Sequence, residues 1–245
     1  MEALAKKPLV RLKDAARDLC PPLVWRGLQR AKAAVRASAV AHGHGGHPST
    51  QDLDVYWDDE MAALLDTWGE GNVWNEIQLL LHDARGRVLD IACGTGKTME
   101  VLSRFPALEL TGCDISDRLI AKARERGIAP ERLRVADATR LDYPDGNFSY
   151  SYSIGSFEHF TEEGIRAVIA ESSRVTTLAS FHMVPVSRSG RDEGWMKTYQ
   201  SFFNNSIPWW LNKYGASYAR VEVLPSAWED SLSVGRWFAC YRKVK

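Results

Sequence analysis

The stretch Val88-Leu89-Asp90-Ile91-Ala92-Cys93-Gly94-Thr95-Gly96 decides the fold of this 245-residue chain. A short apolar run that ends in a carboxylate and continues into a Gly-x-Gly turn is typical of a buried parallel strand followed by a tight loop and a helix. Glycine lets the backbone approach a ligand closely, and the helix that follows offers N–H groups without intrahelical partners. The stretch therefore predicts a loop that binds a nucleotide-like molecule.

Two phosphate-binding loops fit this stretch only in part. A P-loop, Gly-x-x-x-x-Gly-Lys-Ser/Thr, would match Gly96-Lys97-Thr98, but its first glycine would fall on Ile91. A dinucleotide-binding loop, Gly-x-Gly-x-x-Gly, would match Gly94 and Gly96. Its third glycine would fall on Met99, whose bulky side chain opposes close packing of helix on strand. Neither fingerprint is complete.

Further apolar runs downstream end in polar side chains at a regular spacing. Asp114 ends one such run 24 positions after Asp90, and Asp137 lies at the end of another run 23 positions later. Residues 147–156 form a fourth run. A carboxylate at the end of a parallel strand can accept hydrogen bonds from ribose hydroxyls. The chain is therefore expected to place several acidic groups along one edge of a sheet.

The stretch from Leu89 to Gly96 closely resembles the first motif of the class I S-adenosylmethionine-dependent methyltransferases, and the resemblance covers roughly residues 55–245. It implies an α/β fold with a seven-stranded, mostly parallel sheet and helices on both faces, a Rossmann-like methyltransferase fold. The last two strands are expected to form an antiparallel pair. S-adenosyl-L-methionine is the implied cofactor. The alternation of strands and helices by itself indicates only an α/β class.

The resemblance also implies a cofactor site. Asp114 is expected to bind the ribose, Asp137 the adenine amino group, and the end of the fourth strand to face the methionine portion and the acceptor. Helices before the first strand cap the site in this family, although their aromatic rings can equally fill the core. The expected cofactor-binding residues are Tyr56, Trp57, Trp74, Asp90, Ala92, Cys93, Gly94, Gly96, Asp114, Ile115, Asp137, Ala138 and Ser153.

Catalysis of methyl transfer depends mainly on alignment, because the cofactor supplies the reactivity. A hydroxyl acceptor usually also needs a base. His159 is the first candidate base, Glu158 would orient it or hold the acceptor, and His182 is the reserve candidate. The alternative is that all three side chains are structural.

The head of the chain differs in charge from its body. Residues 1–50 hold nine Lys and Arg against three Asp and Glu, although the whole chain balances at 31 against 31. Amphipathic basic helices are predicted at 8–20 and 23–40, followed by a Gly- and His-rich linker at 41–48. These helices suit a membrane surface, a partner, a homo-oligomer contact or packing on their own domain. The methyltransferase domain is expected at 51–245.

Other features set the expected compartment and partners. His42, His44 and His47 lack an accompanying carboxylate or cysteine, so no metal site is expected. The four cysteines form no Cys-x-x-Cys pair, and there is no 18-residue apolar run and no signal-peptide core. We therefore expect a cytoplasmic protein, peripheral to the inner face of the membrane if its basic helices bind there. The balanced charge argues against a nucleic-acid partner.

Residues 185–217 are expected to form a substrate cap. Aromatic faces beside amide and charged groups suit a sugar or an aromatic acceptor, whereas the alternative is that the rings are buried for stability. The aromatic and polar composition of this segment, together with a loose resemblance to methyltransferases of polysaccharide pathways, favours one methyl acceptor. This acceptor is a hydroxyl of a sugar in a glycan or glycoconjugate precursor. The alternatives are a small-molecule (natural-product or quinone-type) O- or N-methyltransferase and a non-catalytic cofactor-binding module. The rings are Trp195, Tyr199, Phe202, Phe203, Trp209, Trp210 and Tyr214.

Overall fold

The computed structural model describes Leu53, Tyr56, residues 58–197 and residues 200–242. The N-terminal extension and linker predicted at 1–50, the candidate lid residue Trp57 and the cap residue Tyr199 lie outside the described residues. No helix in the described part of the chain is long and apolar enough to cross a membrane.

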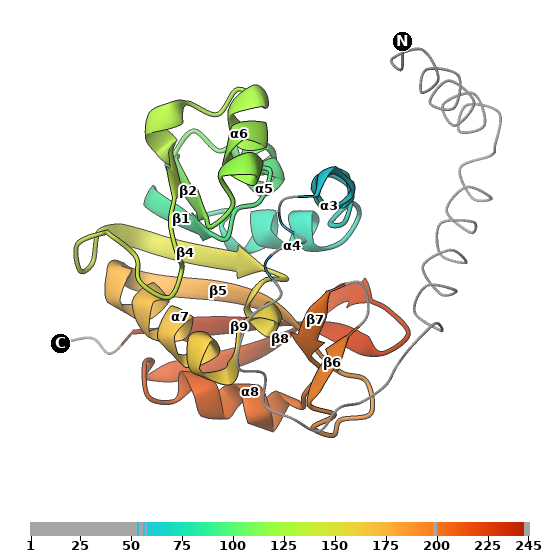
Figure 1. The fold of residues 1–245 in the computed structure, drawn as a ribbon. Helices are drawn as coiled ribbons and strands as arrows, with labels where there is room; N and C mark the ends of the chain where they lie inside the picture. The colour runs from blue at the N-terminus through green and yellow to red at the C-terminus, as the bar shows by residue number, and fades with distance from the viewer. Residues whose placement is uncertain (1–52, 54–55, 57, 198–199, 243–245) are drawn as a thin grey trace, which may run out of the picture. The chain divides into compact units, whose positions relative to one another are not determined.

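The described residues form an α/β domain (Figure 1). Two short 3-10 helices, η2 and η3, interrupt the connections. In chain order the elements are α3 (Asp59–Leu65), α4 (Val73–Leu80), β1 (Gly86–Ile91), α5 (Lys97–Leu102), β2 (Leu108–Asp114), α6 (Asp117–Glu125), η2 (Pro130–Arg132), β3 (Leu133–Val135), β4 (Phe148–Ile154), η3 (Phe157–His159), α7 (Glu162–Val175), β5 (Thr176–Ser187), β6 (Trp195–Lys197), β7 (Ser201–Phe203), α8 (Ile207–Tyr214), β8 (Arg220–Glu229) and β9 (Ser233–Tyr241).

The main sheet has seven strands in the order β3-β2-β1-β4-β5-β9-β8. Strands β1 to β5 pair in parallel, whereas β9 runs antiparallel to both β5 and β8. This confirms the predicted seven-stranded, mostly parallel sheet and its antiparallel final pair. The chain order reverses between β1 and β4, and ligands of open α/β sheets bind beyond the carboxyl ends of the strands at such a point.

Helices cover both faces of the sheet because alternate strand residues point to opposite sides. Val88 of β1 packs in a cluster with buried side chains of α4, α5 and α6. Its neighbour Leu89 packs in a second cluster with buried side chains of α7 and α8. Figure 1 shows these two groups of helices on opposite sides of the strands. The two clusters hold the strand ends rigidly beneath the loops that follow them.

Strand β5 contains a proline near its end. Pro185 lies opposite Gly235 of β9, and β5 continues to Ser187. The pairing with β4 ends earlier, at Met183. Beyond that residue β5 has a partner on one side only, and proline is tolerated where one side of a strand needs no hydrogen-bond donor.

The predicted cap at 185–217 contains the β6–β7 hairpin and helix α8, and its rings mostly serve the core. Trp210 and Tyr214 are fully buried, and Phe203 packs with them in the cluster under α7 and α8. None of the described aromatic side chains of this segment lines the cleft described below. The described rings of this segment therefore pack away from the cleft, whereas Gln200 of the same segment lines it, and the predicted substrate cap stays a prediction.

Candidate active site

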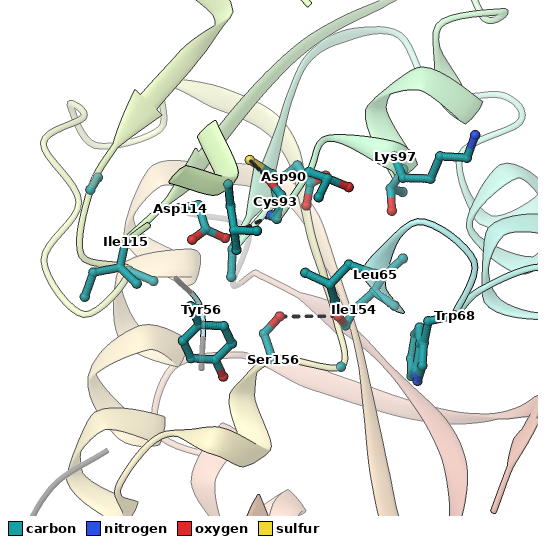
Figure 2. A pocket seen from close by; sticks show the side chains of 18 of the residues that line it. Tyr56, Leu65, Trp68, Asp90, Cys93, Lys97, Asp114, Ile115, Ile154 and Ser156 are labelled. Carbon is teal, nitrogen blue, oxygen red and sulfur yellow. Dashed lines mark hydrogen bonds between the residues drawn. The ribbon is translucent and has the colours of Figure 1, made fainter. Parts of the chain in front are cut away.

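A cleft lies beyond the carboxyl ends of β1, β2 and β4 (Figure 2). It encloses about 1020 Å³, including space open to solvent, which suits a nucleoside-sized ligand together with part of a second molecule. Gly96 and Ser153 do not line it. The predicted cofactor residues that do are Tyr56, Trp74, Asp90, Ala92, Cys93, Gly94, Asp114, Ile115, Asp137 and Ala138.

The loop after β1 is shaped by backbone conformations that few residues adopt. Ala92 has a φ of 59°, in the left-handed region that costs a non-glycine residue roughly 1–2 kcal/mol. Gly96 caps α5 with a φ of 72°. A Cβ on Gly96 would lie 2.4 Å from Cδ1 of Ile128, so this glycine serves close packing of the loop on the segment after α6. Strained backbone of this kind is characteristic of ligand-binding loops.

Asp114, the last residue of β2, holds the glycine loop in place. Its Oδ2 accepts a hydrogen bond from the Gly94 N–H at 2.9 Å, and its Oδ1 accepts one from the Ser116 N–H at 2.9 Å. Burial raises the pKa of this carboxyl, and the backbone hydrogen bonds oppose that shift. Each carboxylate oxygen has a second lone pair, so Asp114 can still accept hydrogen bonds from a ribose at the cleft wall.

Asp90 lies at the end of β1 beside β4. It is buried, and its Oδ2 accepts a hydrogen bond from the Tyr152 hydroxyl at 2.8 Å. Burial is also the main reason that the pKa of Asp90 is raised well above its usual range. The sequence did not single out Tyr152, although its place in the fourth predicted strand could have suggested a partner for Asp90. The register pairs Asp90 directly with Tyr152.

The adenine-binding residues predicted on the third strand lie on a loop instead. Strand β3 ends at Val135, so Asp137 follows the strand by two residues. Its Oδ1 accepts hydrogen bonds from the N–H and the hydroxyl of Thr139, at 2.8 and 2.7 Å. Asp137 is exposed and Ala138 is buried, and both line the cleft. The side chains are placed as expected, at the far end from β4.

Residues before β1 cover the cleft, as the resemblance implies. Tyr56 and Trp74 line it, and Lys97 Nζ lies 5.9 Å from the centroid of the Trp74 ring. Trp68 and Leu65 also line it, and the sequence prediction missed both. Helix α3 ends at Leu65, which leaves Trp68 in the turn that follows.

An ion-pair network joins this cover to the glycine loop. The Thr95 hydroxyl donates to Oδ1 of Asp66, which caps the end of α3, at 2.6 Å. Arg126 pairs with the same carboxylate, and its Nε donates to the Thr95 carbonyl at 3.0 Å. Its Nη1 also donates to Glu100 of α5 at 2.9 Å. The network therefore couples α3 and the glycine loop through one arginine.

Glu158 and His159 lie behind the cleft wall. Neither lines the cleft, although Ser156 and Phe160 on either side of them do. Glu158 is buried, its Oε2 has no hydrogen-bond partner among the described residues, and burial raises its pKa to about 8. Nδ1 of His159 donates to the Ser201 carbonyl at 2.8 Å, which leaves Nε2 facing Glu158 Oε1 at 3.6 Å. Their predicted catalytic role stays a prediction.

His182 lies in the core. It is fully buried, its Nε2 is 2.9 Å from the Ser172 hydroxyl, and its ring packs against Phe157 and Tyr214. Burial lowers its pKa to about 3, so the ring is neutral. Ser153, its partner in the β4–β5 register, is buried as well. The structure therefore gives neither the reserve base nor Ser153 a contact with the cleft.

The described residues show neither a metal centre nor a disulfide. No group of three or more His, Cys, Asp or Glu side chains in the described ranges could hold a metal ion. Cys93, Cys113 and Cys240 are buried free thiols. The three histidines of the linker and Cys20 lie outside the described residues.

The site has a glycine loop after β1, an acidic side chain at the end of β2 and another after β3, on a sheet of the kind that the sequence resemblance implies. Residues 88–177 match the family model described as "Methyltransferase domain". The match runs from within β1 to the start of β5 and includes every strand end that the cleft uses. This part of the chain is therefore similar to a methyltransferase domain.

Curated proteins similar to this chain include methyltransferases. The probable tRNA methyltransferase 9B of Mus musculus is 36% identical over 110 residues, which cover 43% of this chain and 23% of that protein. The 27-O-demethylrifamycin SV methyltransferase of Amycolatopsis mediterranei is 28% identical over 142 residues, covering 53% of this chain and 51% of that protein. The chain therefore spans between about a quarter and a half of these curated relatives.

One solved structure supports the fold over a longer range. The PH0226 protein from Pyrococcus horikoshii OT3 superposes with a TM-score of 0.57, covering 80% of this chain and 96% of that one. The sequence identity is 20%, so this likeness concerns the fold alone.

Proposed function

We propose that this protein transfers the methyl group of S-adenosyl-L-methionine to an oxygen atom of a small organic acceptor. The observation that carries the proposal is the cleft in which Asp114 holds the Gly94 loop by a hydrogen bond of 2.9 Å. The relative named for 27-O-demethylrifamycin SV supports a small-molecule acceptor. A site formed before the ligand arrives loses less conformational entropy on binding.

The chain's own residues fit the cofactor. Asp114 can bind the ribose, Asp137 and Ala138 line the part of the cleft where the adenine is expected, and Tyr56 lines the cleft from the segment before β1. When bound, S-adenosyl-L-methionine supplies a methyl carbon on a sulfonium, so that the new O–C bond forms as the S–C bond breaks and its electron pair stays on sulfur. The protein's share is mainly alignment of the two reactants. The hydroxyl proton must leave to a base or to water.

The sugar acceptor predicted from the sequence stays a prediction. One of its grounds was the aromatic rings of 185–217, and those described do not line the cleft. A glycan acceptor and a location beside the membrane stay predictions that depend on the N-terminal extension, which lies outside the described residues.

Calorimetry of cofactor binding tests the site. Asp114→Ala should raise the Kd for S-adenosyl-L-methionine by roughly 10- to 100-fold, since hydrogen bonds to a charged group contribute about 1.5–3 kcal/mol. The matched control is Asp142→Ala, an exposed aspartate outside the cleft. Equal affinity in the wild type and Asp114→Ala would contradict the assignment of the ribose site.

Transfer of a labelled methyl group into fractionated extract tests the reaction. The proposal expects label in a small-molecule fraction, abolished by Asp114→Ala. Label in glycans or glycolipids would revive the sugar prediction, and label in RNA would point to the acceptor class named for the mouse relative. Cofactor binding without transfer to any fraction would indicate a cofactor-binding module.

A further inference from the structure

Two tryptophans form a wall at one end of the cleft. Trp68 is half-buried in the turn after α3 and lines the cleft. Its ring packs against Trp228 of β8, with the centroids 5.4 Å apart and the planes inclined by 39°. Trp228 thus packs against one part of the Trp68 indole, while Trp68 also lines the cleft. The indole is therefore held in place by a second ring.

In the sheet, the strands next to this wall lie on the other side of β1 from the strands that carry the predicted nucleoside-binding residues. Asp114 and Asp137 follow β2 and β3, whereas Trp68 lies beside Gly155 at the end of β4 and contacts β8. Figure 2 shows Asp114 at one end of the cleft and Trp68 at the other. Asp114 and the loop after β1 would hold the nucleoside part of the cofactor, as the sequence resemblance implies. The space beside Trp68 is thus left for the acceptor.

Gly155 lets the indole come close to the strand end. It has a φ of 61°, and a Cβ there would lie 3.0 Å from Cη2 of Trp68. Any larger residue would push the indole away from β4. The remaining surroundings are mainly apolar, with Leu65, Ile154 and Phe160 lining the same cleft. A flat apolar ring would be buried here against an aromatic face, an arrangement that favours stacking.

The titratable side chains that line the cleft make it better suited to an acceptor whose hydroxyl loses its proton easily. Among the described residues that line it there is no histidine or glutamate. The aspartates that line it already accept hydrogen bonds from Tyr152 (Asp90), Gly94 and Ser116 (Asp114) and Thr139 (Asp137). A phenol has a pKa of roughly 10, as the tyrosine side chain does, whereas a sugar hydroxyl is a much weaker acid. A phenolic acceptor therefore needs less help from a base.

We propose that the end of the cleft at Trp68 is an acceptor subsite for a planar phenol or hydroquinone, whose ring stacks on the indole while its hydroxyl oxygen faces the cofactor's methyl carbon. The hydroxyl oxygen forms the new bond to carbon, and its proton passes to solvent. This inference rests on the proposed function, and it names the acceptor class for the same site. Trp68 acts in it as the residue that determines specificity.

The first test compares variants in methyl transfer. Purified protein is given labelled S-adenosyl-L-methionine with a panel of naphthols and hydroquinones and a matched panel of sugars. Trp68→Leu should raise KM for the aromatic acceptors by about tenfold, given stacking energies of roughly 1–3 kcal/mol, and change the Kd for the cofactor less than twofold. Trp68→Phe should retain most of the affinity. The matched control is Trp209→Leu, a half-buried tryptophan outside the cleft.

The second test measures binding without turnover. Calorimetry of 2-naphthol with protein saturated in S-adenosylhomocysteine should show binding in the wild type and Trp209→Leu, and about tenfold weaker binding in Trp68→Leu. The proposed subsite would be refuted by equal binding in all three proteins or by no binding in the wild type. Methylation of sugars in preference to phenols would refute it as well. Failure of the proposed function is distinct, because it would appear as absent transfer to every fraction while 2-naphthol still binds the protein saturated in S-adenosylhomocysteine and binds Trp68→Leu more weakly.

Discussion

The pH dependence of stability should be governed in part by Glu158. The side chain is buried, its Oε2 has no hydrogen-bond partner among the described residues, and burial raises its pKa from an ordinary 4.5 to about 8. Glu158→Gln replaces the carboxyl by an amide of the same shape that cannot ionise. The variant therefore separates the cost of a buried charge from the packing of the side chain.

The magnitude follows from the two pKa values. Below pH 4.5 the folded and unfolded chains both carry the proton, whereas between 4.5 and about 8 only the folded chain keeps it. Stability is thus highest at low pH and falls as pH rises through this window, by up to about 1.4 kcal/mol per pH unit. Across the window the loss is up to about 5 kcal/mol, after which it levels off. Glu158→Gln should match the wild type near pH 5 and exceed its stability near pH 9.

Urea unfolding at a series of pH values from 5 to 9 measures this difference, because other titrating groups cancel between the two proteins. The control is Glu163→Gln, an exposed glutamate in the first turn of α7. Its stability curve should stay parallel to that of the wild type. Parallel curves for Glu158→Gln as well would refute the burial of an uncharged carboxyl behind the cleft wall.

Two further predictions concern the network at α3 and the buried histidine. Arg126→Met removes the charge that joins Asp66 to the Thr95 carbonyl, so we expect a loss of about 2 kcal/mol in urea unfolding and weaker cofactor binding by calorimetry. Unchanged values for both would show that the network is dispensable. His182→Asn should keep methyl transfer, because the ring has no contact with the cleft. The pKa of His182 is lowered to about 3, so the wild type should lose stability as pH falls from 6.5 toward 3. The His182→Asn variant should lose less stability over the same range. Equal losses in the two proteins would contradict the burial of His182 as a neutral ring.

The cofactor half of the site was largely predictable, because it is encoded locally. An apolar run followed by Asp90 and a Gly-x-Gly turn specifies strand, loop and helix within one stretch of chain, and Asp114 ends the next strand by the same pattern. Parallel strands bring their carboxyl ends to one edge, so residues at strand ends meet without further information. The resemblance to a known family added the number of strands and the mostly parallel sheet.

The cover and the acceptor end were not predictable in the same way. Trp68 meets Gly155 and Trp228 across long separations in the chain, and Arg126 meets Asp66 from 60 residues away. Such contacts depend on where α3 ends and how helices dock on the sheet. Neither is specified by local spacing, because burial and packing with distant residues override local preference.

By itself the sequence determined the class of fold, the loop that receives the cofactor and the acidic side chain that holds it, since hydrophobic periodicity and glycine positions act over a few residues. Only the tertiary structure decided which of the predicted side chains line the cleft and can contact a ligand. It buried four of the rings predicted to form the cap (Phe202, Phe203, Trp210 and Tyr214), buried His182 as a neutral side chain, left Glu158 out of the cleft lining and placed Trp68 in it. The physical reason is that exposure to a cleft, and the pKa that follows from it, are set by packing between segments distant in the chain.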